Sequence, residues 1–378
     1  MLTHLGTISI ETFLRDYWQQ KPLLVRNAFP DFESPLTPDE LAGLALEEDV
    51  ESRIVLENGS EGPWQLLNGP FEESAFSQLP ETHWTLLVQA VDQWVPEAQE
   101  FLEQFKFLPS WRLDDLMVSY APQGGSVGPH FDFYDVFLIQ GHGQRRWQVG
   151  PKADDDSPRV ANTKLRILKN FKVEHEWVLE PGDMLYLPPQ YSHNGVALND
   201  CLTYSVGFRA PSVGEIIDDL ATDAISHHKD HQRYTDPGEP LANSGEISPA
   251  AIEGLKATLQ KALLDEGLLR NWLGRYMTAR KYPELDISQG ADADWAEQLY
   301  SGALLQRHPA SRFAYSQTGA DSAQLFVDGE AVATSLSLAE LLCGGDALDW
   351  QQLQNHLADK GGRNVLEQLV EYGALYLD

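Results

Sequence analysis

Two segments of the chain alternate between polar and apolar residues as half-buried β-strands do. They are residues 112–120 and 202–208. Because alternate side chains of a strand share a face, one face of each segment is polar. These polar faces consist of Asp115, Met117 and Ser119 in the first segment and of Thr203, Ser205 and Gly207 in the second. Both faces suit the wall of a site, although a solvent-exposed strand would show the same alternation.

Helical spacing of apolar residues replaces alternation in three other segments. Residues 84–106 carry this spacing and predict a helix. Residues 213–231 and 249–266 predict two amphipathic helices, the first of which begins with the capping box Ser212-Val213-Gly214-Glu215. Their apolar stripes lie outside the strand-rich part of the chain. We therefore expect residues 212–280 to form a helical module that pairs two chains as a homodimer.

The last part of the chain, residues 281–378, predicts helices around a β-hairpin. Helical patterns at 291–305, 336–344, 348–359 and 363–373 accompany strands near 312–317 and 324–333, with Asp328-Gly329 as the hairpin turn. This order is typical of a winged-helix-like domain. The segment holds five Lys or Arg and fifteen Asp or Glu, so its charge is 5 − 15 = −10. Phosphate binding needs basic residues, so we expect no direct DNA binding.

Composition restricts partners and compartment. The net charge of −30 argues against broad nucleic-acid contacts and suits a basic partner. Salt-adapted proteins are equally acidic, and the sequence leaves both explanations open. The chain has no membrane-length apolar run and no pattern of a signal peptide, and its two cysteines, Cys201 and Cys343, lie far apart. We expect a cytoplasmic protein with free thiols and no membrane partner.

The first candidate metal ligands lie in residues 128–147, where we predict a strand that carries His130 and Asp132 and is followed by Arg145. His130 and Asp132 are two residues apart, so an imidazole and a carboxylate would share one face. A second histidine, His193, follows a Gly-Asp turn, an apolar strand and a Pro-Pro stop. Two histidines and one carboxylate form the facial triad of non-haem Fe(II) oxygenases. Arg145 shares a face with Trp147, and a buried arginine there would need an anionic partner.

These segments resemble the JmjC-type, cupin-fold 2-oxoglutarate oxygenases. Within that group they are most similar to the bacterial ribosomal oxygenases that hydroxylate an arginine of ribosomal protein L-sixteen. The resemblance is carried by Gly128–Phe137, Gly143–Trp147, Glu180–Asp183 with Leu187–Pro189, Tyr204–Pro211 and, near the N-terminus, Trp18–Arg26. It implies an α+β fold in which a double-stranded β-helix (cupin/JmjC) barrel at 1–211 precedes the helical dimerisation module at 212–280 and the winged-helix-like domain at 281–378.

The resemblance also implies roles for single residues. His130, Asp132 and His193 would hold Fe(II) and form the catalytic centre, with 2-oxoglutarate and O2 as co-substrates. Arg145 would pair with the far carboxylate of 2-oxoglutarate, and Ser119 and Thr203 would add contacts to it. The substrate arginine would be bound by Asp115, Met117, Tyr134 and Ser205.

Three alternatives remain open from the sequence. One is a related oxygenase that acts on histidine or asparagine side chains, against which Asp115 argues, because a carboxylate selects a cation. A second is a lysine demethylase. The third is a non-catalytic metal-binding cupin or a cupin isomerase, neither of which requires a buried cation at Arg145.

Overall fold

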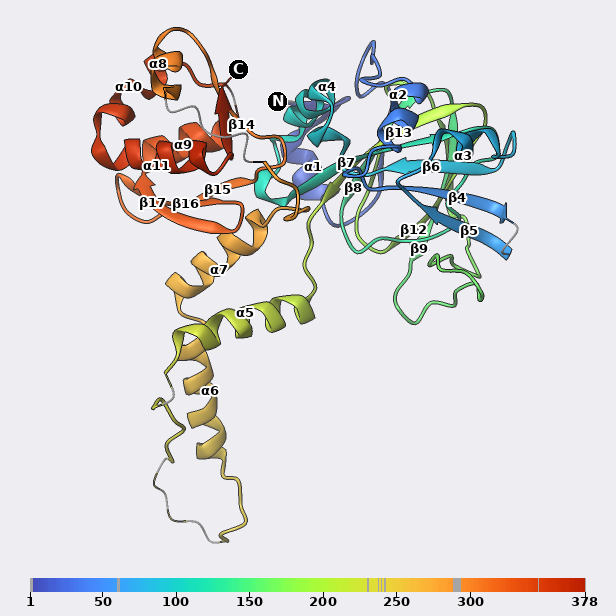
Figure 1. Cartoon of the computed structure of the whole chain (residues 1–378). Helices are drawn as coiled ribbons and strands as arrows, with labels where there is room; N and C mark the ends of the chain where they lie inside the picture. The colour runs from blue at the N-terminus through green and yellow to red at the C-terminus, as the bar shows by residue number, and fades with distance from the viewer. Residues whose placement is uncertain are drawn as a thin grey trace. The chain divides into compact units, whose positions relative to one another are not determined.

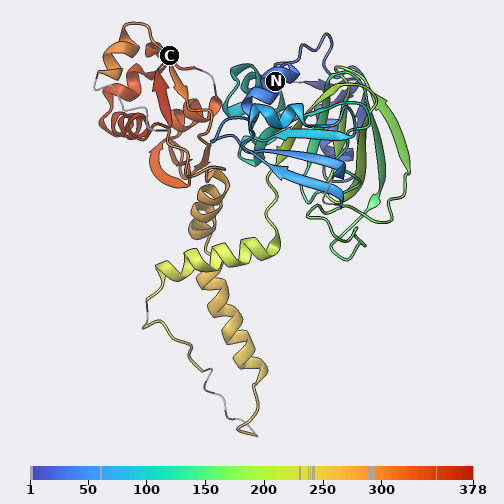
Figure 2. The same cartoon turned by 45° about the vertical axis from the view of Figure 1, so that its right-hand side comes forward.

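The computed structural model describes residues 3–59, 62–229, 231–236, 238, 240, 243–287, 294–345 and 347–377. The chain divides into two compact units, Met1–Ala210 and Pro211–Asp378, shown from blue to green and from yellow-green to red in Figures 1 and 2. The second unit contains both the predicted dimerisation module and the predicted winged-helix-like segment. The division into three domains therefore stays a prediction.

The first unit is built on two antiparallel sheets. The larger sheet has the order β3-β11-β8-β13-β7-β6-β4-β5 and the smaller one the order β10-β9-β12. The strands of the larger sheet are β3 (Leu23–Val25), β4 (Ser52–Gly59), β5 (Gly62–Asn68), β6 (Trp84–Val88), β7 (Leu113–Ala121), β8 (Val136–His142), β11 (Met184–Leu187) and β13 (Cys201–Phe208). Those of the smaller sheet are β9 (Arg145–Lys152), β10 (His175–Leu179) and β12 (Tyr191–Ala197).

Buried side chains join the two sheets face to face. Val136, Leu138 and Leu185 of the larger sheet form one apolar cluster with Trp147 and Val149 of the smaller sheet. Strand order and this shared core give the double-stranded β-helix that we predicted. Both polar segments identified from alternation, β7 and β13, are neighbours near the middle of the larger sheet.

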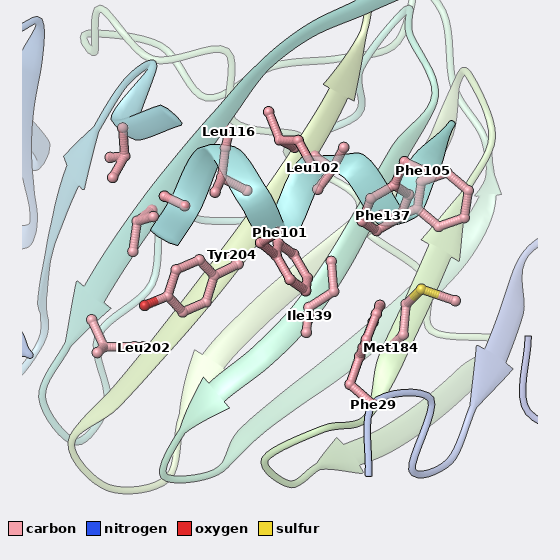
Figure 3. Packing of buried hydrophobic residues seen from close by; sticks show 14 of the residues in the cluster. Phe29, Phe101, Leu102, Phe105, Leu116, Phe137, Ile139, Met184, Leu202 and Tyr204 are labelled. Carbon is pink, nitrogen blue, oxygen red and sulfur yellow. The ribbon is translucent and has the colours of Figure 1, made fainter. Parts of the chain in front are cut away.

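The other face of the larger sheet is covered by short helices and N-terminal segments. Figure 3 shows Phe101 and Phe105 packing over Phe137, Ile139 and Tyr204 of the sheet. This burial stabilises the sheet and leaves its opposite face available for the site. The elements outside the sheets are β1 (His4–Leu5), β2 (Ile8–Ser9), α1 (Ile10–Asp16), α2 (Pro38–Leu44), α3 (Glu73–Ser77), α4 (Pro96–Leu102) and the short 3-10 helices Val91–Gln93, Glu103–Phe105 and Ser110–Arg112.

The predicted helix at 84–106 is wrong over its first part. Residues Trp84–Val88 form strand β6, which pairs with both β4 and β7. A strand buried on both faces shows a continuous apolar run, which periodicity alone does not distinguish from a buried helix. A short 3-10 helix follows at Val91–Gln93, and α-helix begins only at Pro96, where proline occupies the first helical turn.

The second unit combines helices with two small sheets. Its helices are α5 (Val213–His227), α6 (Pro249–Leu263), α7 (Glu266–Thr278), α8 (Trp295–Tyr300), α9 (Leu336–Gly344), α10 (Trp350–Ala358) and α11 (Lys360–Glu371). Its strands are β14 (Leu305–Arg307), β15 (Phe313–Gln317), β16 (Ser322–Val327), β17 (Glu330–Ser335) and β18 (Leu375–Leu377). Asp328-Gly329 connects β16 to β17 as predicted. Residues 291–293 of the predicted 291–305 helix lie outside the described residues. No helix in the described part of the chain has the length and apolar character needed to cross a bilayer.

Candidate active site

Three predicted ligands converge between the two sheets. One ligand atom from each of His130, Asp132 and His193 lies within 4.8 Å of the others. Oδ2 of Asp132 is 3.9 Å from Nε2 of His130 and 3.6 Å from Nε2 of His193. An ion that sits about 2.0–2.2 Å from each nitrogen and oxygen fits atoms separated in this way. The arrangement can therefore hold one metal ion.

Both histidines present the same nitrogen to this centre. Nδ1 of His130 lies 2.8 Å from the carbonyl oxygen of Gly128, and Nδ1 of His193 lies 2.9 Å from that of Tyr191. A carbonyl only accepts, so each Nδ1 carries the proton and each Nε2 keeps a lone pair. Burial, followed by the neighbouring His130, lowers the pKa of His193 to about 4. His193 is consequently neutral at pH 7, as a metal ligand must be.

The segment that carries His130 and Asp132 is not the regular strand that we predicted. Only His130 is paired, in an isolated bridge with His193, and β8 begins at Val136. In that bridge each histidine N–H donates to the other's carbonyl oxygen, at 3.0 and 2.8 Å. The carbonyl of Asp132 accepts from the N–H of Gln190 at 2.6 Å. The side chains of His130 and Asp132 are therefore not aligned by the alternation of a regular strand. Backbone hydrogen bonds to His193 and Gln190 align them instead.

Gly128 allows the chain to turn into this segment. Its φ is +80°, a conformation that glycine adopts without strain. A Cβ at this position would lie 2.6 Å from Ile167 and 3.2 Å from Trp64. Both the backbone and the packing therefore require glycine where the carbonyl oxygen must meet Nδ1 of His130.

Asp135 anchors the other end of the irregular segment. Its carboxylate is fully buried and accepts from the hydroxyl of Tyr186 at 2.6 Å and from Nε2 of Gln19 at 3.1 Å. Arg112 forms an ion pair with it at 3.2 Å. Burial, and then Asp135, raise the pKa of Tyr186, so its hydroxyl stays a donor. This network fixes the chain three residues after Asp132.

Arg145 lies at one end of the site with both residues predicted to assist it. It is 3% exposed, and its Nη1 is 3.3 Å from Oγ of Ser119 and 3.5 Å from Oγ1 of Thr203. Thr203 in turn donates to Oε1 of the buried Gln140 at 3.3 Å. Burial lowers the pKa of the Arg145 guanidinium. Among the described residues no carboxylate forms an ion pair with Arg145.

Two buried donors near Arg145 favour an anionic ligand. Nε of Arg145 and Nε1 of Trp147 have no hydrogen-bond partner in the described part of the chain. The Trp147 ring lies 5.2 Å from the Arg145 guanidinium and 6.0 Å from the His193 ring. An unpaired buried cation is strongly unfavourable, and a bound carboxylate would relieve it. Gly195 makes room for both side chains, since a Cβ there would lie 2.8 Å from each of them.

Three of the residues predicted to bind substrate, Asp115, Met117 and Ser205, lie on β7 and β13. Along these strands they are on one side of Ser119 and Thr203, the residues that contact Arg145. Asp115 pairs in register with Gly207, and Met117 pairs with Ser205. The Asp115 side chain is buried, and its Oδ2 accepts from Nε2 of Gln89 at 2.7 Å and from the N–H of Ala90 at 3.0 Å. The carboxylate is therefore held in a fixed orientation beside the polar face of β13.

Tyr134 joins this group from the irregular segment. Asp132, followed by burial of the phenol and by Asp115, raises the pKa of Tyr134 well above its usual value. The tyrosine is 43% exposed overall, so it lies at the edge of the site. Arg53 also reaches this region from β4, with Nη2 3.8 Å from the sulfur of Met117. The structure thus gathers the ten predicted site residues into the ligand triad and two neighbouring groups. One group is around Arg145 and the other is around Asp115.

Sequence reasoning missed several residues that position the site: Arg53, Gln89, Asp135, Gln140 and Gly195. Asp135 and Gln140 could have been found from the sequence. A charged residue at the start of an apolar strand and a glutamine within one are both unusual. Gln89 follows β6, which pairs with β7, and Arg53 lies on β4, the next strand of the sheet, so only tertiary structure brings both near β7.

Comparison with known proteins agrees with this geometry. Residues 100–216 match the family described as JmjC domain, and residues 258–376 match the family described as ROXA-like winged helix. The chain is 34% identical over 374 residues to the ribosomal protein uL16 3-hydroxylase of Escherichia coli (strain K12), and the match covers 98% of each chain. It is 35% identical to a probable ribosomal oxygenase of Haemophilus influenzae, over 93% of this chain and 90% of that protein.

Solved structures give the same result. The structure of YcfD, a ribosomal oxygenase from Escherichia coli, in complex with cobalt and 2-oxoglutarate has a TM-score of 0.86 at 33% identity, with 99% of each chain covered. Its complex with cobalt and succinic acid has a TM-score of 0.83 at 32% identity, also over 99% of each chain. These matches confirm the predicted fold class, including the winged helix. The winged-helix match begins at residue 258, inside the segment predicted to be the dimerisation module.

The buried Asp135 network yields a stability prediction. Asp135→Ala removes the buried carboxylate that pairs with Nη2 of Arg112 and accepts from the Tyr186 hydroxyl, so the free energy of unfolding should fall by roughly 3–5 kcal/mol. Asp114→Ala is the matched control, because it breaks the more exposed Asp114–Arg209 pair and should cost at most about 1 kcal/mol. Denaturant unfolding measures both. Equal effects of the two substitutions would contradict the anchoring role of Asp135.

Proposed function

Because this chain belongs to the JmjC-type ribosomal oxygenases, we propose that it uses Fe(II), 2-oxoglutarate and O2 to hydroxylate an arginine side chain of ribosomal protein L-sixteen (uL16). The observation that carries this proposal is the position of the ligand triad near two buried charges. Arg145 of β9 contacts Ser119 and Thr203 of β7 and β13, and Asp115 lies further along β7. One end suits an anionic co-substrate and the other a cationic substrate.

The donor set fits Fe(II). His130, Asp132 and His193 supply two neutral imidazoles and one carboxylate, which leave coordination positions open for co-substrate and oxygen. The protonated Nδ1 atoms fix both rings through backbone carbonyls, so the rings need not rearrange when the ion binds. A site whose ligands are already aligned loses little conformational entropy on metal binding.

The region around Arg145 fits 2-oxoglutarate. Its guanidinium is planar and can bind the far carboxylate through two parallel hydrogen bonds. Ser119 and Thr203 already contact Nη1, and Nε and the Trp147 indole N–H remain as donors. The co-substrate would thus replace unsatisfied polar groups with charge-assisted hydrogen bonds. Gln140 contributes by holding the hydroxyl of Thr203.

The reaction converts a substrate C–H, O2 and 2-oxoglutarate into a C–OH, succinate and CO2. Bound Fe(II) supplies the oxygen activation that an unactivated C–H bond requires. The contribution of the chain is to align the target carbon with the metal and to keep water out. The buried Trp147 and Val149 beside His193 serve the second purpose.

Asp115 supports arginine as the target. A carboxylate that is 3% exposed selects a cation, because burying it beside a neutral group would be costly. It argues against histidine and asparagine targets, although it does not by itself separate arginine from a methylated lysine. The planar guanidinium fits the fixed carboxylate oxygen better than a point charge does. A storage cupin or cupin isomerase would bind no anionic co-substrate, so the buried Arg145 cation would have no partner of opposite charge.

The partners and compartment follow from this substrate. A uL16-type substrate is basic and is made in the cytoplasm, which we propose as the place of action. The acidic chain, with a net charge of −30, would attract such a partner at low ionic strength.

We also propose that α5, α6 and α7 pair two copies of the chain. Apolar side chains are exposed along them: Val213 at 73%, Ile217 at 62%, Ile225 at 73%, Ile252 at 43%, Leu255 at 45% and Leu259 at 49%. Helix α5 packs on α7, where Nε1 of Trp272 donates to Asp219 at 2.7 Å. Helix α6 has no buried residue and projects away from the strands of its own unit (Figure 1). A second copy would bury these stripes.

Co-substrate binding can be tested through Gly195. Gly195→Ala should push Arg145 and Trp147 from their positions and weaken 2-oxoglutarate binding by about tenfold or more. Asp132→Ala should instead remove Fe(II) binding. Equilibrium titrations without oxygen measure both constants separately. A Gly195→Ala protein with the parent's affinity for 2-oxoglutarate would contradict the assigned role of Arg145.

Substrate choice can be tested through Asp115. A charge-assisted contact with arginine is worth roughly 1.5–3 kcal/mol, so Asp115→Asn should weaken use of an arginine peptide by about ten- to a hundredfold. Binding of Fe(II) and 2-oxoglutarate should stay nearly unchanged. Steady-state hydroxylation of matched Arg, Lys and His peptides, detected by mass, measures the effect. Preference of the parent for the His peptide would overturn the arginine assignment.

Assembly can be tested by sedimentation. The parent should be a dimer at micromolar concentration, and the double substitution Leu255→Asp, Leu259→Asp should make it monomeric by placing charge in the apolar stripe. Lys261→Asp, on the opposite side of α6, is the control and should remain dimeric. A monomeric parent would remove the proposal.

A further inference from the structure

One segment of the first unit departs from the acidic character of the chain. Residues 157–172, which we call the basic segment, contain five Lys or Arg and no Asp or Glu, so their formal charge is +5. The net charge of the whole chain is −30, so all other residues together carry −30 − 5 = −35. Positive charge concentrated in so acidic a chain indicates a role toward an anion.

The basic segment is held against the part of the chain that carries two of the metal ligands. Leu168 is buried, and its N–H donates to the carbonyl oxygen of Pro129 at 2.7 Å, directly before His130. The guanidinium of Arg159 lies 5.8 Å from the ring of Phe131, the residue between the two ligands. The basic segment therefore borders the metal site, although it belongs to neither of the two sheets.

The lysines of the basic segment present their charge to solvent. Lys164 and Lys169 are exposed and form no ion pair with any of the described residues. Lys172 is 77% exposed, and its only ion-pair contact in the described chain is with Glu174 at 3.9 Å. The two arginines of the segment, in contrast, share the carboxylate of Asp155. Positive charge at this surface thus comes mainly from the three lysines.

A small anion fits this surface better than a polyanion does. Nucleic acid would cover a large area of the protein, and a net charge of −30 would repel its phosphates. A small dianion is affected mainly by charges within one Debye length, which is about 8 Å at physiological salt. The hydrogen bond from Leu168 to Pro129 brings the backbone of the basic segment within that distance of His130.

We propose that the basic segment steers the dianion 2-oxoglutarate to the metal site, with Lys164, Lys169 and Lys172 as the residues that raise its rate of association. Steering acts before contact is made, so it speeds binding and leaves dissociation nearly unchanged. The same charges repel a cationic substrate, so they give no such advantage to an arginine peptide. This inference rests on the proposed function, in which 2-oxoglutarate is the co-substrate.

Stopped-flow mixing of the Fe(II)-loaded protein with 2-oxoglutarate, in the absence of oxygen, measures association through the absorption that appears when a keto acid chelates Fe(II). The triple substitution Lys164→Gln, Lys169→Gln, Lys172→Gln should slow association by about three- to tenfold at about 10 mM salt, where the Debye length is about 30 Å. At about 1 M salt the Debye length is about 3 Å, and the difference should disappear. The dissociation rate should change by less than about twofold.

Two controls separate steering from other effects of the triple substitution. Lys256→Gln, Lys261→Gln, Lys360→Gln changes the net charge equally at exposed positions of α6 and α11, and it should keep the parent's association rate. The second control is association of a uL16 arginine peptide, which carries the opposite charge and should not slow when the lysines of the basic segment are replaced. Damage to the shape of the site would slow both ligands at every salt concentration.

The outcomes distinguish this inference from the proposed function. If the parent binds 2-oxoglutarate and the triple variant of the basic segment binds it equally fast at low salt, steering is wrong and the proposed function stands. If the control triple variant slows association to the same extent, or if the arginine peptide slows as much as 2-oxoglutarate, steering by this segment is again wrong. If the Fe(II)-loaded parent binds no 2-oxoglutarate, both proposals fail.

Discussion

The pairing of His130 with His193 is the constraint on which the site depends. Two reciprocal backbone hydrogen bonds join His130 to His193 of β12. Each Nδ1–H donates to a carbonyl two residues earlier in its own chain segment. The same bonds bring Asp132 within reach, because Gln190 holds its carbonyl. The metal geometry is consequently fixed by backbone groups.

Strands β7 and β13 carry the residues for co-substrate binding and for substrate binding at different positions along their length. Ser119 pairs with Thr203, Met117 with Ser205 and Asp115 with Gly207, so three successive rungs face the site. A strand rises about 3.3 Å per residue, which puts Asp115 roughly 13 Å from Ser119. This span accommodates an anionic co-substrate at the Arg145 end and a cationic side chain at the Asp115 end, with the metal between them. Alternation on two neighbouring strands is thus enough to separate the two binding functions.

The parts of this arrangement that follow from local pattern were predicted from the sequence. Alternation identified the inward faces of β7 and β13, and the spacing of His130, Asp132 and His193 identified the triad. Local pattern failed at Trp84–Val88, where a strand buried on both faces resembles a helix. It also failed between Phe131 and Asp135, where bonds to distant residues replace regular pairing. The role of Gln89 could not be predicted, because it depends on which side chain the fold brings beside the turn after β6.

The central claim is that one protein couples 2-oxoglutarate to an arginine of uL16 through this triad. The most direct measurement combines intact uL16 with the protein, Fe(II), 2-oxoglutarate and isotopically labelled O2, and counts both succinate and label. We expect one succinate per labelled oxygen atom found in uL16, with the label on a single arginine. Succinate formation that uL16 does not accelerate, or label on a histidine or lysine, would contradict it.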